Sequence, residues 1–217
     1  WLAVATISVR ISRFCGYAWP MSYKPANPDN DIIYGFHSVG EALKNPSRKF
    51  VKLLATQNAA ERLKAEIAGA GLVPEIVLPK LLDRQLEPDA VHQGLLLEAR
   101  RLLQPRLDQV SPDGIIVMLD QVTDPHNVGA ILRSCAAFGV SALVATARHS
   151  ASASGVLLKA ASGAYEHVPY VKVTNLARAM DELREQGFTL LGLDSEAEIA
   201  LADSTLAQPL ALVLGAE

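Results

Sequence analysis

Residues 120–133 hold an amide, a glycine and a guanidinium where a predicted strand gives way to a predicted helix. Asn127 stands at the expected start of the helix, and Gly129 and Arg133 follow along it. Free backbone N–H groups at a helix start, with a guanidinium nearby, can bind a phosphate. Helical side chains lean toward the N-terminus of their helix, so Arg133 can reach the loop of residues 121–127. The chemistry that this segment predicts is the binding of a phosphate.

A second interpretation stays open, and on spacing alone it is the better supported one. In it, Asn127 only caps the helix and Arg133 is an ordinary solvated side chain. Arg133 lies off the buried stripe of the helix, and small residues share its side, which leaves room for a bulky ligand. The stripe is Val128, Ile131, Leu132 and Cys135, and the small residues are Gly129, Ala130 and Ala137.

Another candidate lies after the last predicted strand. Gly215, directly after Leu214, lets a ligand approach the backbone, and the carboxylate of Glu217 can pair with Arg133. Taken alone, Gly-Ala-Glu is a weak signal, because an exposed glutamate often follows a strand. The ligands of open parallel sheets bind beyond the carboxyl ends of the strands, however. Since this candidate and the loop of residues 120–127 both follow such strands, we interpret them as one site.

The first positioning unit is predicted at residues 32–101, which alternate helix and strand signals. A helix is expected at 33–45, another at 58–68 with Asn58 as its cap, and a short one from Pro79. Strands are expected at 50–55, 75–78 and 94–99. A linker with two prolines is expected at 102–113.

The second unit is predicted at residues 114–217 and carries the candidate site. The order of its elements predicts a mainly parallel sheet with helices on both faces, an α/β fold. Strands are expected at 115–119, 142–146, 168–173, 189–193 and 210–214, and helices at 127–138, 152–164 and 174–186, the last capped by Thr174.

Composition fits such a fold and limits the partners. The chain has 217 residues, 50% of them apolar and 6% aromatic, and two cysteines. The cysteines and the scattered histidines show no metal-ligand pattern. The net charge of −3 argues against attraction of the whole surface to nucleic acid but leaves local patches open. We predict an RNA track from Lys44, Arg48, Lys49, Lys52, Arg100 and Arg101, although a solvated face is the commoner outcome for such clusters.

The beginning of the chain carries no functional prediction. Residues 1–31 are expected to be a disordered extension, and Met21 looks like a better natural start than Trp1. Residues 1–20 have too short an uninterrupted apolar run for a membrane span and lack the order of a secretory signal. A cytoplasmic protein without a membrane anchor is therefore expected.

The order of several segments resembles the SpoU (TrmH-type) RNA ribose methyltransferases. Within that family, the resemblance is closest to the bacterial enzymes that methylate a guanosine 2′-hydroxyl of 23S ribosomal RNA. The segment at 119–130 resembles the first family motif, and 34–43 with 91–94 resembles the substrate-binding unit. The remaining similar segments are 173–177 and 212–217.

The resemblance implies a fold and a cofactor. It implies an L30e-like RNA-binding unit followed by a SPOUT α/β domain with a C-terminal trefoil knot, an exception to the rule against threaded loops. S-adenosylmethionine would bind in the knot of a homodimer, against Leu214 and Gly215, without the glycine-rich loop that other folds use. The third family motif would lie beyond Glu217. We therefore expect an incomplete knot, poor cofactor binding and no activity in this 217-residue chain.

The resemblance also implies catalytic roles. Arg133 would assist loss of the 2′-hydroxyl proton, with Asn127 and Glu217 shaping its surroundings. A guanidinium stays protonated, with a pKa above about 12, so a milder role is to clamp the RNA phosphate and stabilise the developing alkoxide. Two alternatives remain: a non-catalytic RNA-binding protein of the ribosome, and a related enzyme that acts on transfer RNA.

Overall fold

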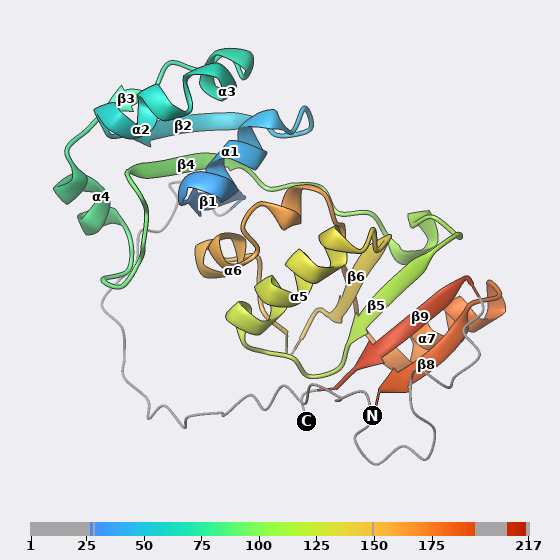
Figure 1. Ribbon diagram of the computed structural model, residues 1–217. Helices are drawn as coiled ribbons and strands as arrows, with labels where there is room; N and C mark the ends of the chain where they lie inside the picture. Colours follow the sequence, from blue (N-terminus) through green and yellow to red (C-terminus); the bar gives the residue numbers. More distant parts are fainter. Residues whose placement is uncertain (1–26, 28, 149, 194–207, 216–217) are drawn as a thin grey trace, which may run out of the picture.

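Two α/β units follow each other along the chain (Figure 1). The computed structural model describes residue 27 and residues 29–148, 150–193 and 208–215. Most of the expected N-terminal extension lies outside these residues. Asn30 and Asp31 are an exception, because both are buried in the first strand. Among the described residues, no helix has both the length and the apolar character that crossing a membrane requires.

The first unit is a four-stranded mixed sheet with order β1-β4-β2-β3. β4 runs antiparallel to β1 and β2, and β2 runs parallel to β3. The elements are β1 (Asn30–Tyr34), α1 (Phe36–Lys44), β2 (Phe50–Ala55), α2 (Gln57–Arg62), α3 (Lys64–Gly69), β3 (Glu75–Ile76), α4 (Pro79–Gln85) and β4 (Leu95–Arg100).

The structure corrects the beginning of this unit. The helix expected from residue 33 begins only at Phe36, because the preceding residues form β1 and pair with β4. The helix expected at 58–68 is two helices, which are interrupted at Leu63. Its cap is Thr56 rather than Asn58, since the Thr56 hydroxyl accepts a hydrogen bond from the backbone N–H of Ala59.

The second unit is a five-stranded sheet with order β7-β6-β5-β9-β8 in which every pair is parallel. This confirms the predicted parallel sheet. The elements are η1 (Leu107–Gln109), β5 (Ile115–Leu119), α5 (Pro125–Ala137), β6 (Ala142–Thr146), α6 (Gly155–Ala160), η2 (Ala164–Glu166), β7 (Tyr170–Val173), α7 (Leu176–Glu185), β8 (Thr189–Leu193) and β9 (Leu210–Leu214).

Helices cover both faces of this sheet (Figure 1). Alternate residues of a strand point to opposite faces. Val117 and Leu119 of β5 pack into the core that contains α5 and α6, whereas Ile116 and Met118 pack into the core that contains α7.

Helix ends in the second unit differ from the predictions by a few residues. α5 begins two residues early, at Pro125, and α6 spans only Gly155–Ala160. α7 is capped by Asn175, whose side chain accepts from the backbone N–H of Arg178, rather than by Thr174. β7 begins at Tyr170, after the expected residue 168.

The two units share one hydrophobic core. Ile33 of β1 and Val39 of α1 belong to the same buried cluster as Leu157, Leu158 and Tyr165 of the second unit. α1 and β1 therefore pack directly against α6 and η2, and the relative orientation of the units is set by packing.

Candidate functional site

The carboxyl ends of β5 and β9 lie side by side, as the candidate site requires. Leu119 is in register with Leu214, and the backbone N–H of Asp120 donates to the carbonyl of Leu214 at 2.9 Å. The loop that begins at residue 120 and the exposed Gly215 therefore meet at one edge of the sheet. The prediction that these two segments adjoin is confirmed. Glu217 and its expected pairing with Arg133 lie outside the described residues.

The start of α5 is already occupied by a carboxylate. Asp124 caps the helix, and its Oδ1 accepts from the backbone N–H of His126 at 2.9 Å. Pro125, the first helical residue, has no N–H to offer. Asn127 is therefore not the cap but an exposed residue of the first turn, and the interpretation of the helix start as a phosphate grip is corrected.

Gly129 is a packing residue rather than room for a ligand. A Cβ at this position would lie 2.5 Å from the Cβ of Ala160 and 2.8 Å from the backbone nitrogen of Ala161. α5 and α6 therefore touch at Gly129, and this contact brings the segment after α6 beside Arg133. The interpretation of Gly129 as part of an open approach to Arg133 is wrong.

Arg133 faces an open cleft between the two units, with a volume of about 430 Å³. Its side chain is exposed, one helical turn from Ala136, which also lines the cleft. The other lining residues come from α1 and from the segment 161–167: His37, Glu41, Ala161, Ser162, Gly163, Ala164 and His167. The sequence analysis did not find this cleft. The i, i+4 spacing of His37 and Glu41 on one helix was a usable signal, because such residues share a face.

Glu41 links the units inside this cleft. Its Oε2 lies 2.9 Å from Nε2 of His167, and its Oε1 accepts from Lys44 Nζ at 2.9 Å. The hydrogen bonds from Lys44 and then from His167 hold the pKa of the Glu41 carboxyl below its ordinary value, although burial opposes them. Glu41 therefore remains charged and paired at neutral pH.

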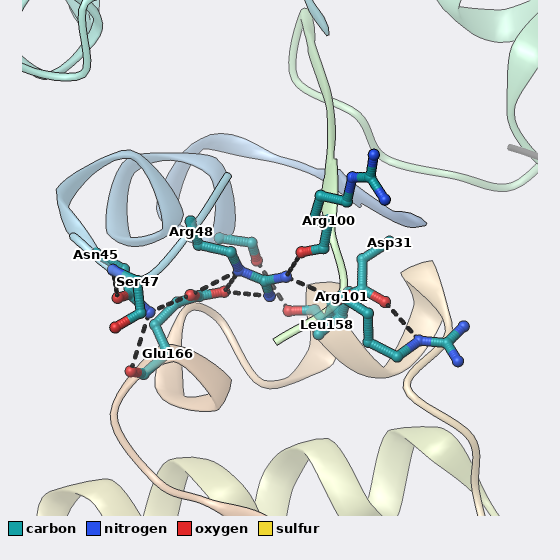
Figure 2. A network of polar contacts seen from close by, with 9 residues as sticks. Asp31, Asn45, Ser47, Arg48, Arg100, Arg101, Leu158 and Glu166 are labelled. Atoms are coloured by element: carbon teal, nitrogen blue, oxygen red, sulfur yellow. Dashed lines mark hydrogen bonds and ion pairs between the residues drawn. The ribbon is translucent and has the colours of Figure 1, made fainter. Parts of the chain in front are cut away.

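Arg48 is buried between the units and not on an RNA-binding surface (Figure 2). Its Nη1 donates to Asp31 Oδ2 at 2.7 Å and to the carbonyl of Arg100 at 2.9 Å, and its Nη2 donates to Glu166 Oε1 at 2.7 Å. Burial alone would lower the pKa of Arg48, but Glu166 and Asp31 outweigh that effect and raise it. This enclosure corrects the expectation that Arg48 contacts RNA.

The other basic residues of the expected RNA track reach solvent. Lys44 and Lys52 form exposed ion pairs with Glu41 and Glu75, and Arg101 approaches Asp31 with its largely exposed side chain. The remaining exposed members are Lys49 and Arg100. Exposed pairs of this kind contribute little stability, so these side chains can exchange their partners for a phosphate.

A second polar link joins the segments 34–43 and 91–94 to the second unit. Gln93 Oε1 accepts from the backbone N–H of Phe36 at 2.8 Å and from Lys159 Nζ at 2.9 Å. Gly35, with a φ of +88°, leaves space for the Lys159 amine, which would lie 2.2 Å from a Cβ there. These two segments therefore help to dock the first unit onto α6.

The carboxyl end of β9 is an open apolar edge. Leu212 and Leu214 are only partly buried, although β9 has a neighbouring strand on each side. Gly215 follows without a side chain and is exposed. Within the described ranges, no three His, Cys, Asp or Glu side chains come together as a metal site would need. Leu214 and Gly215 therefore leave apolar surface and backbone accessible at the carboxyl end of β9.

Both units match known protein families. Residues 32–105 match the family described as RNA 2'-O ribose methyltransferase substrate binding, and residues 114–217 match the SpoU rRNA Methylase family. The chain is 38% identical over 198 residues to the 23S rRNA (guanosine-2'-O-)-methyltransferase RlmB of Yersinia pestis, which covers 87% of this chain and 80% of that protein. It is 37% identical to the protein of the same name from Vibrio cholerae, with the same coverage.

Solved structures share the fold. The SpoU methyltransferase AviRb from Streptomyces viridochromogenes, in complex with AdoMet, has a TM-score of 0.71 at 21% identity and covers 87% of this chain and 74% of that one. An AdoMet-bound rRNA methyltransferase from Sinorhizobium meliloti has a TM-score of 0.70 at 19% identity, with 86% and 70% covered. The sequence identity to the curated relatives, together with the two family matches, shows that the chain belongs to the SpoU rRNA methylase family.

Proposed function

We propose that this protein transfers a methyl group from S-adenosylmethionine to the 2′-hydroxyl of a guanosine in 23S ribosomal RNA. The observation that carries the proposal is the position of Arg133, on the helix that follows β5 and in a cleft shared with the substrate-binding unit. The names of the curated relatives support the substrate, since these relatives share 37–38% identity over most of this chain.

The edge at β9 fits the cofactor. The partly exposed Leu214 offers an apolar surface for an adenine ring, and Gly215 lets backbone groups approach it. We therefore assign the cofactor contacts to Leu214 and Gly215. When bound, S-adenosylmethionine supplies an electrophilic methyl group. The protein must then hold the ribose oxygen in line with that methyl, because positioning alone can supply much of the acceleration.

Arg133 acts on the RNA in this proposal. Its guanidinium stays protonated, so it binds the phosphate beside the reacting ribose and stabilises charge that develops on the 2′-oxygen. Asn127 lies six residues earlier on α5, which is roughly 9 Å along the helix axis at about 1.5 Å per residue. We propose that Asn127 orients groups at the cofactor edge and that Glu217 assists there.

The RNA backbone would continue from the cleft over the exposed basic side chains. We assign this track to Lys44, Lys49, Lys52, Arg100 and Arg101.

We also propose a cytoplasmic homodimer with a trefoil knot at the carboxyl end of β9. The knot is supported by the position of β9, the last described strand, between β5 and β8 rather than at an edge. Light scattering of the purified protein tests the dimer.

A methyl-transfer assay tests the proposed function. The full gene product is incubated with tritiated S-adenosylmethionine and, in separate reactions, with unmodified 23S ribosomal RNA and with transfer RNA. Label in 23S RNA that is recovered as 2′-O-methylguanosine after nuclease digestion supports the proposal. Label in transfer RNA alone would instead identify a transfer RNA enzyme, and RNA binding without label would identify a non-catalytic RNA-binding protein.

A further inference from the structure

The cleft beside Arg133 is built by both units. His37 and Glu41 come from α1, Arg133 comes from α5, and Ser162 and His167 come from the segment between α6 and β7. Its volume of about 430 Å³ lies within the ordinary range of ligand pockets, roughly 300–1,000 Å³. The cleft can therefore take a group of the size of one nucleotide unit.

The polar groups of the cleft suit an anion. Arg133 carries a permanent charge, and the imidazole of His37 and the hydroxyl of Ser162 can each donate a hydrogen bond. The Nε2 of His167 is held by Glu41 at 2.9 Å, so its Nδ1 is left for a ligand and donates when the ring is protonated. Glu41 is the carboxylate in the lining, and its two oxygens are already in contact with Lys44 and His167.

Packing fixes the walls of the cleft before any ligand arrives. A Cβ at Gly163 would lie 2.6 Å from Cγ of Glu41, so α1 rests directly on this turn. Next to it, the buried contact between Arg48 and Glu166 ties the first unit to η2. A site that is already ordered loses less entropy when it binds its ligand.

We propose that this cleft binds the RNA phosphate next to the methylated nucleotide, and that His37 and His167 share that phosphate with Arg133. The two histidines hold the RNA backbone in the cleft and do not touch the reacting ribose oxygen. The substrate-binding unit thus acts at the reacting nucleotide itself. The inference rests on the proposed function, because only an RNA substrate supplies this phosphate.

The test separates RNA binding from turnover. The dissociation constant for unmodified 23S RNA is measured by filter binding without methyl donor, and KM and kcat are measured with it, for wild type, His37→Leu and His167→Leu. We expect each variant to raise Kd and KM about tenfold, the loss of one hydrogen bond to a charged group, with kcat at saturating RNA within about twofold. Arg184→Gln, which removes a cation from α7 on the other face of the sheet, is the matched control and should leave all three unchanged.

A second variant at His37 distinguishes loss of the phosphate contact from misfolding. His37→Lys supplies a positively charged hydrogen-bond donor at the cleft and should bind RNA at least as well as wild type, whereas a loss of binding in this variant would overturn the proposal. Wild-type methyl transfer with unchanged Kd and KM in both leucine variants would overturn the proposed role of the cleft and leave the proposed function standing. Weakened RNA binding in both variants, with no methyl transfer by wild type, would support the cleft and overturn the proposed function.

Discussion

The guanidinium of Arg48, in the first unit, donates to the carboxylate of Glu166, in the second, across 2.7 Å (Figure 2). The two side chains are 0% and 3% exposed, and Asp31, which binds the same guanidinium, is 1% exposed. Two carboxylates thus share one buried cation at the contact between the units. Separation of the units would take the buried carboxylate of Glu166 away from the Arg48 guanidinium. This contact therefore holds the substrate-binding unit in one orientation.

Arg48→Ala should therefore destabilise the protein by about 3–5 kcal/mol, the usual cost of breaking a buried ion pair from one side. The measurement is the free energy of unfolding from urea titration. The neighbouring Lys49→Ala is the control, and as an exposed substitution it should change stability by less than about 0.5 kcal/mol. Equal urea midpoints for the two variants would show that the buried network does not contribute.

Gly129→Ala should destabilise the contact between α5 and α6. The added methyl group would lie 2.8 Å from the backbone nitrogen of Ala161, so one helix must move. We expect a net loss of roughly 1–3 kcal/mol from overpacking, although alanine favours a helix more than glycine does. Gly69, in α3, has nothing within 4 Å of the place that a Cβ would take, and Gly69→Ala is expected to be neutral or stabilising. A lower melting temperature for Gly129→Ala, with that of Gly69→Ala unchanged or higher, would bear this out, and matching melts would contradict it.

Four strands of the second sheet could be predicted because each is a largely apolar run between polar segments. β5, β6, β8 and β9 begin and end where the sequence places them. This pattern is typical of strands that are buried on both faces, as β5 and β6 are. β1 was missed because its identity depends on pairing with the distant β4, and because the chain turns into α1 after a single residue, Gly35.

Part of the candidate site could likewise be predicted from local sequence, and part could not. The local sequence located the segments that follow β5 and β9. The order of the strands was enough to predict that the carboxyl ends of β5 and β9 adjoin. The burial of Arg48 and the direction of Arg133 depend on how one unit packs on the other. The Asn-Pro-Ser-Arg-Lys segment that contains Arg48 is polar and resembles an exposed turn, so no local pattern marks it as buried. Contacts between units therefore set the limit of sequence-based prediction here.

Lys172 should make stability depend on pH in the alkaline range. Its Nζ donates to the carbonyl of Ala151 and to the hydroxyl of Tyr170, each at 2.8 Å, and burial lowers its pKa from 10.5 to about 8. Between these two values the unfolded chain binds more protons than the folded one, so stability should rise with pH through this window. Urea midpoints of wild type and Lys172→Met are compared from pH 7 to about pH 10. The slope should be smaller in the variant, and identical slopes would contradict the low pKa.

Arg133→Ala should abolish most methyl transfer without affecting the fold. The side chain is exposed, and its removal leaves the buried stripe of α5 intact, so the unfolding midpoint should stay close to that of wild type. Loss of a group that stabilises charge in the transition state costs about 10²–10³ in kcat. Arg133→Lys keeps the charge but loses the planar fork, so it should recover part of the phosphate binding and little of the rate. Single-turnover rates at saturating 23S RNA give the comparison. Near-full activity in the alanine variant would show that Arg133 neither binds the RNA phosphate nor stabilises charge on the 2′-oxygen. The cleft would then have no demonstrated part in methyl transfer.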